Sequence, residues 1–256
     1  MLRIVPALLA ALFFQSFAAA ADKPQETRLF ELRIYTAAKG KLDDLHTRFR
    51  DHTLKLFEKH GMQNIGYWVP LDNTEEKLYY LLAHKDRATR DASFKAFAAD
   101  PDWDAARKAS EANGKITAAI ANHFLSATDY SPPIAPSISK ADRVFELRTY
   151  TATKGNLDNL NARFRDHTVK LFEKHGMTNL WYTTLAKGEK NDDLMLIYML
   201  AHKSEADGKK SFDAFRLDPD WLTARKASEE KGGGSLTTPD GVKSIYMKAT
   251  DYSPTK

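Results

Sequence analysis

Apolar and polar side chains alternate along residues 30–36, which predicts a strand. Its apolar members lie on one face, and Glu31, Arg33 and Tyr35 lie on the other. Downstream, apolar residues recur three or four positions apart, with His52 in their row, until a glycine ends the pattern. This spacing predicts an amphipathic helix with a glycine at its carboxyl end.

Three further patterns complete this unit. Residues 65–69 and 78–83 are aromatic and aliphatic runs separated by turn-forming residues, which predicts a hairpin. Residues 92–112 have helical spacing that is interrupted or restarted near Pro101, and residues 120–127 form a last strand. The order β-α-β-β-α-β is the ferredoxin-like arrangement.

The whole pattern occurs twice. Residues 30–64 and 145–179 align over 35 positions, of which 8 differ, so 27 are identical. Matching blocks continue to the end of each copy, and the offset between copies grows from 115 to 118 to 122, which places small insertions in loops. We therefore expect a first unit over residues 28–131, a proline-rich linker over residues 132–142 and a second unit over residues 143–256.

This organisation predicts an α+β protein built from two ferredoxin-like domains. A four-stranded sheet with both helices on one face leaves the other face bare, and that face must be covered. The second unit is the obvious cover, so the two sheets should pair as an intramolecular pseudo-dimer.

The first residues predict an exported protein. Arg3 precedes an unbroken apolar run from Ile4 to Phe14, and Ala18-Ala19-Ala20 forms a small-residue cleavage signature. The run is too short for a bilayer, which needs ~20 residues. Residues 1–21 are thus expected to be a signal peptide, and the protein to be periplasmic or secreted without a membrane span.

Composition narrows the classes of function. The chain has no cysteine, so neither a disulfide scaffold nor a cysteine-anchored lipoprotein is expected. Its 38 basic and 34 acidic side chains give a net charge of +4, and the basic residues are spread among acidic ones. Nucleic-acid binding is not expected, because it usually requires a clustered basic face.

Several blocks resemble a known family. The FELRIY run, the RFRDHTLKLFEKHGM block and the FKAFAADPDWDAARKASE segment, in this order and repeated, resemble the NIPSNAP family. The resemblance covers both copies and implies a dimeric α+β barrel. Relatives with that fold include muconolactone isomerases, antibiotic-biosynthesis monooxygenases and haem-binding chlorite dismutases. The resemblance implies a fold and not a reaction.

The strongest candidates for ligand binding are the polar residues of the first strand of each copy. They are Glu31, Arg33, Tyr35, Glu146, Arg148 and Tyr150. If the apolar face packs on the helices, these side chains point into the space between the two sheets, where they could hold a small polar or anionic molecule. The alternative is that acid and guanidinium only pair with each other in a polar core.

The candidates for catalysis are His52, His167, Tyr35 and Tyr150. Both histidines occupy positions on the predicted apolar side of their helices. Such a histidine serves as a general base, as a haem or metal ligand, or as a core residue bonded to a carbonyl. No motif for a metal is present, and no cofactor is predicted, although haem stays open.

Three functions are compatible with these residues. The first is a protein that binds a small molecule between the sheets. The second is a cofactor-free monooxygenase or isomerase of the dimeric α/β barrel type. The third is a structural or interaction protein with no ligand. Fold analogy alone supports the enzyme, and fold does not determine function.

Overall fold

The computed structural model describes residues 26–256, so the expected signal peptide lies outside the described residues. The first unit contains β1 (Leu29–Ala37), α1 (Leu42–Arg48), the π-helix η1 (Phe49–Thr53), α2 (Leu54–Lys59), β2 (Gln63–Pro70), β3 (Lys77–His84), α3 (Arg87–Ala98), α4 (Pro101–Ser110) and β4 (Thr117–Ala127). The second contains β5 (Val144–Ala152), α5 (Leu157–Arg163), the π-helix η2 (Phe164–Thr168), α6 (Val169–Lys174), β6 (Thr178–Leu185), β7 (Met195–His202), α7 (Glu205–Leu217), α8 (Pro219–Lys231) and β8 (Thr237–Ala249).

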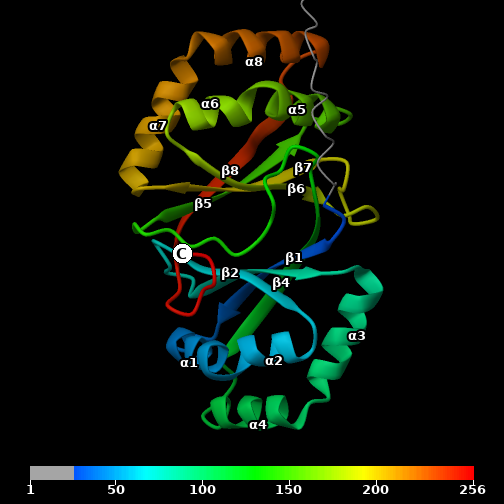
Figure 1. Cartoon of the computed structure of the whole chain (residues 1–256), viewed down its shortest axis with the longest axis vertical. Coiled ribbons are helices and arrows are strands. Elements are labelled where there is room, and N and C mark those ends of the chain that lie inside the picture. Colours follow the sequence, from blue (N-terminus) through cyan, green and yellow to red (C-terminus); the bar gives the residue numbers. More distant parts are fainter. Residues whose placement is uncertain (1–25) are drawn as a thin grey trace, which may run out of the picture.

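The eight strands form one closed antiparallel barrel. Its order is β1-β3-β2-β8-β5-β7-β6-β4. The last strand of each unit closes the barrel by crossing to the other unit, where Trp68 of β2 pairs with Ala249 of β8 and Leu125 of β4 pairs with Leu185 of β6. Figure 1 shows the sheets in the middle of the molecule and the helices of the two units at opposite ends. The predicted intramolecular barrel of two βαββαβ units is confirmed.

The barrel interior is apolar and is filled by both units. Phe30 and Leu32 of β1 meet Phe145 and Leu147 of β5 in one buried cluster. Ile134 of the linker belongs to the same cluster and is 1% exposed. The linker therefore contributes to the core in addition to joining the units.

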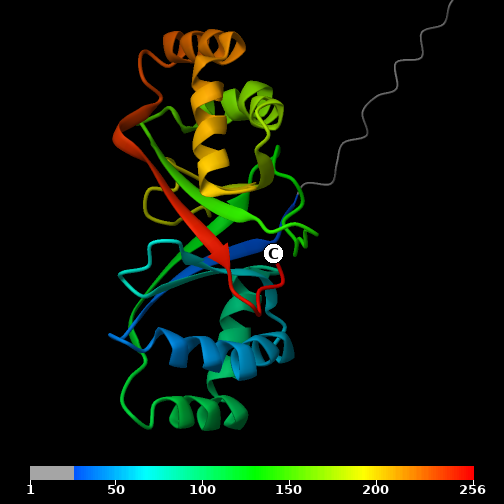
Figure 2. The same cartoon turned by 90° about the vertical axis from the view of Figure 1, so that its left-hand side faces the viewer.

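The C-terminal segment of each unit docks on the other unit. Asp251 accepts two hydrogen bonds from Arg50 of the first unit, at 2.6 and 2.8 Å. Asp129 accepts the equivalent pair from Arg165 of the second unit, at the same two distances. The red C-terminal segment in Figure 1 and the crossing of β8 in Figure 2 make this exchange visible. The contacts fasten the units on either side of the barrel.

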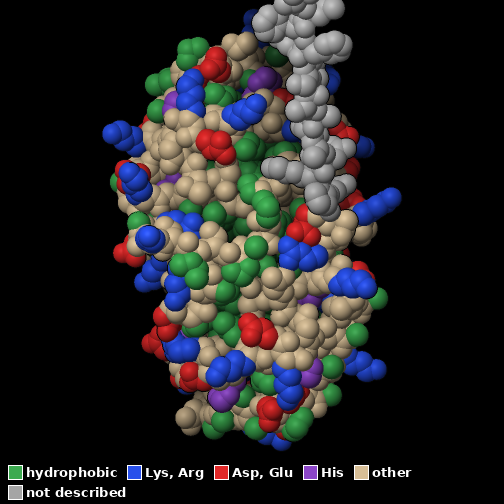
Figure 3. Space-filling view, in the orientation of Figure 1, with side chains coloured by type: hydrophobic (Ala, Val, Ile, Leu, Met, Phe, Trp, Pro, Cys, Tyr) green, Lys and Arg blue, Asp and Glu red, His purple; other side chains and the backbone are tan. Residues whose placement is uncertain are grey.

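Two further features concern the surface charge and the helices. Lys and Arg side chains are interspersed with Asp and Glu over the face shown in Figure 3. Within residues 26–256, no helix combines the length and the apolar character needed to cross a membrane.

Candidate functional site

A pocket of about 200 Å³ lies between the outer face of the barrel and the helices of the first unit. Larger hollows lie elsewhere, along α8 and beside α1, but this one combines aromatic walls with a buried arginine. Its lining residues are Tyr35, Arg48, Phe49, Thr53, Phe57, Phe94, Phe97, Trp103, Arg107, Glu111, Thr117 and Ile120.

The aromatic walls are held by their helices. Asp100 caps α4 by accepting a hydrogen bond from the Asp102 amide at 2.9 Å, and Pro101 occupies the start of that helix. Trp103 then packs on Phe97 of α3, with ring centroids 4.4 Å apart. The capped start of α4 thus places Trp103 against Phe97 as one wall of the pocket.

Arg48 is the polar group that distinguishes this pocket. It is 5% exposed, and its guanidinium lies 5.1 Å from the Trp103 ring centroid. Its Nη1 donates to Glu111 at 3.2 Å, which is a long contact for an ion pair. Among the described residues its buried Nε has no hydrogen-bond partner. One N–H of a buried guanidinium in an aromatic pocket therefore has no acceptor within the described part of the chain.

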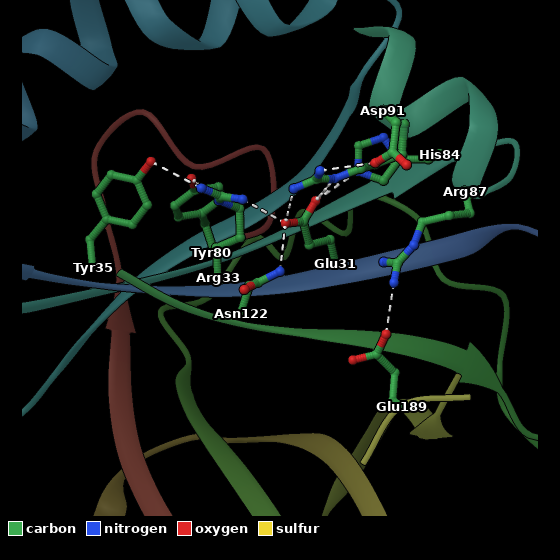
Figure 4. Close-up of polar contacts among 10 residues, drawn as sticks. Glu31, Arg33, Tyr35, Tyr80, His84, Arg87, Asp91, Asn122 and Glu189 are labelled. Atoms are coloured by element: carbon green, nitrogen blue, oxygen red, sulfur yellow. Dashed lines mark hydrogen bonds and ion pairs between the residues drawn. The ribbon is translucent and has the colours of Figure 1, made fainter. Parts of the chain in front are cut away.

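A polar layer lies behind the pocket (Figure 4). The Arg33 guanidinium donates to Tyr80 Oη at 2.7 Å, to Glu31 Oε1 at 2.5 Å and to Tyr35 Oη at 3.4 Å. Glu31 also accepts two hydrogen bonds from Arg90 of α3, at 2.7 and 2.8 Å. Tyr35 thus belongs both to this layer and to the pocket lining.

The charges of this layer control the ionisation of Glu31. Burial alone would raise the pKa of this fully buried carboxyl group. The nearby His84 and Arg90, together with the charge of Arg33, outweigh burial and lower the pKa to about 2. Glu31 is therefore a carboxylate at neutral pH and not a proton donor.

The second unit repeats the layer with other partners. Arg148 donates to Glu146 at 2.5 Å and to Tyr198 Oη at 3.0 Å. His202 Nε2 lies 2.9 Å from Glu146 Oε2, closer than the 3.5 Å between the equivalent His84 and Glu31 of the first unit. Burial opposes ionisation here too, but His202 and Arg148 lower the pKa of Glu146.

The predicted orientation of the first strands is wrong. Glu31, Arg33 and Tyr35, like Glu146, Arg148 and Tyr150, face the helices and not the space between the sheets. Their strand neighbours Phe30 and Leu32 fill the barrel instead. The barrel wall is made of strands whose backbone groups bond to one another, so its interior favours apolar residues. The helix side supplies partners for the charges, such as Arg90 and the hydroxyl of Tyr80.

The predicted positions of His52 and His167 are also wrong. Both side chains are exposed, and the following residues Thr53 and Thr168 are buried. Each histidine lies in a π-helix, which adds a residue to the turn and so rotates the helical pattern. The hydroxyl of Thr53 donates to the Arg48 carbonyl at 3.1 Å across this turn. The pocket therefore contains threonine and not histidine.

The structure also bears on metals and haem. No group of three or more His, Cys, Asp or Glu side chains in residues 26–256 is placed to hold a metal ion. The pocket lining contains no histidine, a frequent axial ligand of haem, so its residues do not fit a histidine-ligated haem.

Sequence reasoning missed Arg48 as a site residue. It precedes the phenylalanine of the RFRDH block, and its counterpart Arg163 lies in the same block of the second copy. The available signal was that this block and the DPDW block are both repeated. Only the fold brings Arg48 and Trp103 together, since 55 positions separate them (103 − 48).

Comparisons with known proteins agree with this architecture. The model of the NIPSNAP family matches residues 30–132 and 145–254. An anthrone oxidase-like protein superposes with a TM-score of 0.55 at 12% identity, covering 88% of this chain and 92% of its own. A candidate monooxygenase from Lactobacillus acidophilus NCFM has a TM-score of 0.52 at 12% identity, with 88% and 94% covered.

A single-unit protein is similar to part of the chain. An uncharacterized NIPSNAP domain protein from Burkholderia xenovorans is 23% identical and covers 41% of this chain and 99% of its own, with a TM-score of 0.36. A comparison with curated proteins found no match. At these identities the solved structures support the fold alone.

Proposed function

This chain belongs to the NIPSNAP family, and from that premise we propose that it binds a small aromatic molecule with a polar or anionic substituent. The binding site is the pocket of the first unit, between β1 and the helices. The main observation behind this proposal is that Arg48 Nε, in a pocket with aromatic walls, has no hydrogen-bond partner among the described residues.

The size and lining of the pocket set the class of ligand. A volume of about 200 Å³ matches one aromatic ring with a short substituent, since an apolar cavity of roughly 150 Å³ holds benzene. The rings of Phe97 and Trp103 offer faces for stacking. Arg48 and the hydroxyl of Tyr35 would direct an acceptor oxygen of the ligand.

The charge around Arg48 favours a modest negative charge or a neutral acceptor. Glu111 lies 3.2 Å from Nη1 and offsets part of the positive charge. Nε remains available for a carbonyl, phenolic or carboxylate oxygen. Glu31 and Arg33, behind the pocket, would fix the position of the Tyr35 hydroxyl without contacting the ligand.

Substitution of the buried arginines tests this function. Isothermal titration with acetophenone and phenol should find saturable binding of at least one compound, weakened about tenfold or more in Arg48→Leu, the loss of one hydrogen bond to a charged group. Arg163→Leu is the matched control, because it removes the equivalent buried arginine from the second unit. Equal losses in both variants, or no binding by the unmodified protein, would contradict the proposal.

We also propose that the chain is exported and processed. Arg3, the apolar run from Ile4 to Phe14 and the alanines before Ala21 support this proposal. Mass spectrometry of the protein from its native cells should find an N-terminus near Ala21 or Asp22. Recovery of the intact N-terminus in the cytoplasmic fraction would contradict it.

A further inference from the structure

A second cavity, of about 240 Å³, lies where the linker crosses β2 and β6. It is distinct from the pocket around Arg48 and shares no lining residue with it. Its walls include Ile65, Trp68, Pro132, Pro133, Arg143 and Trp181. Residues from both units and from the linker therefore build it.

Hydrogen bonds fix the segments around this cavity. Arg28 donates to the Ile134 carbonyl at 2.9 Å and holds the linker against the first unit. The Ser137 amide donates to Thr255 Oγ1 at 3.2 Å, and Thr255 Oγ1 donates to the Ile65 carbonyl at 2.5 Å. The linker and the C-terminal segment are thus tied to the edge of β2, and the cavity between them is a preformed one.

Two residues that line this cavity each have a buried N–H without an acceptor in the described part of the chain. Trp68 is 0% exposed, and its indole Nε1 has no hydrogen-bond partner among residues 26–256. The Nε of Arg143 is likewise buried without a partner in the same part of the chain. The cavity lining contains no Asp or Glu side chain. Buried N–H groups are nearly always paired with protein, water or ligand, so this site requires acceptor oxygens.

The cavity arises from a difference between the two copies. Gly66 and Trp68 of β2 occupy the positions of Trp181 and Thr183 in β6, according to the strand registers. A Cβ added to Gly66 would lie 2.4 Å from Cη2 and Cζ2 of Trp68, so glycine is required beneath this ring. Thr183 satisfies its own hydroxyl by donating to the Ile197 carbonyl at 2.8 Å. At this strand position, therefore, the first unit has an indole N–H without an acceptor among the described residues, and the second unit has a hydroxyl that is hydrogen-bonded.

We infer that this cavity binds a small monocarboxylate whose hydrocarbon part is the size of one ring. The carboxylate would accept hydrogen bonds from Trp68 Nε1 and Arg143 Nε, and its hydrocarbon part would pack against Trp181 and the prolines. A cavity of about 240 Å³ has room for such a molecule, given that roughly 150 Å³ holds benzene. The linker would then form one wall of a binding site.

Benzoate is the probe for this inference, with benzyl alcohol as its uncharged analogue. Titration of the full chain should give saturable benzoate binding with a change in tryptophan fluorescence, and affinity about tenfold or more lower for benzyl alcohol. Trp68→Phe keeps an aromatic ring but removes the N–H, and should weaken benzoate binding to a similar extent. Trp221→Phe is the control with unchanged affinity, because that tryptophan lies in the second unit and does not line this cavity.

Further variants separate this site from the pocket around Arg48. Arg143→Met should weaken benzoate binding like Trp68→Phe, and it decides the question if Trp68→Phe does not fold in a thermal melt. Arg48→Leu should leave the fluorescence-detected binding unchanged. Loss of benzoate binding in Arg48→Leu alone would assign it to the first pocket and overturn the inference. Equal affinities in Trp68→Phe and the unmodified chain, or a cavity filled by ordered water only, would overturn it as well.

Discussion

The two units surround the same buried glutamate with different neighbouring side chains. Each buries a glutamate, Glu31 or Glu146, next to an arginine two residues later on the same strand. The first unit adds Arg90 from α3, and the second has Gly208 at that position, with Tyr246 and His202 beside it. A Cβ on Gly208 would lie 3.0 Å from the Tyr246 hydroxyl and from His202 Cγ, so a side chain at this position would require both neighbours to shift.

This difference shows that the repeated Glu-Arg-Tyr pattern is a structural element, and that different neighbouring side chains can stabilise its buried glutamate. A buried carboxylate must be paired: a histidine lies beside it in both units, at 3.5 Å in the first and 2.9 Å in the second, and the first unit adds a second arginine. The first unit therefore carries more positive charge between barrel and helices than the second. Because Arg48 has its equivalent in Arg163, this difference in charge comes from Arg90.

The largest effect is expected from removing the arginine of the second unit. In Arg148→Leu, Glu146 loses its only arginine partner within residues 26–256, and the free energy of unfolding should fall by roughly 3–5 kcal/mol. Arg33→Leu should cost less, since Arg90 still bonds to Glu31 through two nitrogens. Urea unfolding at pH 7 compares the two, and equal losses would contradict the asymmetry.

Acid stability tests the charge state of Glu31. Because its folded pKa of about 2 lies below the unfolded value, ionised Glu31 stabilises the fold above pH ~4.5. That stabilisation, roughly 3 kcal/mol, should disappear as the pH falls from ~4.5 to ~2. Unfolding free energies of Glu31→Gln, measured over this range, should depend less on pH than those of the unmodified protein. The same pH dependence in both proteins would contradict the assignment.

Replacing residues of the first unit by those at the equivalent positions of the second unit should have a moderate effect on stability. Arg90→Gly removes two hydrogen bonds to Glu31 and leaves a space in α3. Adding Phe124→Tyr places a hydroxyl where the second unit has Tyr246, and should restore about 1 kcal/mol. A double-mutant cycle by urea unfolding measures this coupling, and additive losses would show that the hydroxyl does not reach Glu31.

The smallest effect is expected at the exposed histidines. His52→Ala and His167→Ala should change the unfolding free energy by no more than ~0.5 kcal/mol, as for most surface substitutions. Thr53→Ala should cost about 1 kcal/mol, because it removes a buried hydrogen bond to the Arg48 carbonyl. Thermal melts of the three variants check the order, and a large loss at His52 would contradict the π-helix.

The sequence predicted the elements and their duplication because alternation, helical spacing and repeats are local signals. It did not determine which face of β1 points inward, because Phe30 and Leu32 on one side and Arg33 on the other fit either orientation. Only the closure of the barrel decides this, since an interior walled by paired strands has no partners for charge.

The candidate site was predicted only in part for the same reason. Tyr35 was predicted and lines the pocket, whereas Arg48 was not predicted. His52 was assigned to the buried face by a count of 3.6 residues per turn, and η1 departs from that count. A single inserted residue in a helix is not visible in the hydrophobic pattern.

A crystal structure of the full chain soaked with acetophenone tests the binding pocket most directly. The proposal predicts density for the aromatic ring in the pocket lined by Phe97 and Trp103, with the ketone oxygen within hydrogen-bonding distance of Arg48 Nε. An empty pocket in which Arg48 Nε is bonded to ordered water, or a ligand bound only elsewhere, would contradict it.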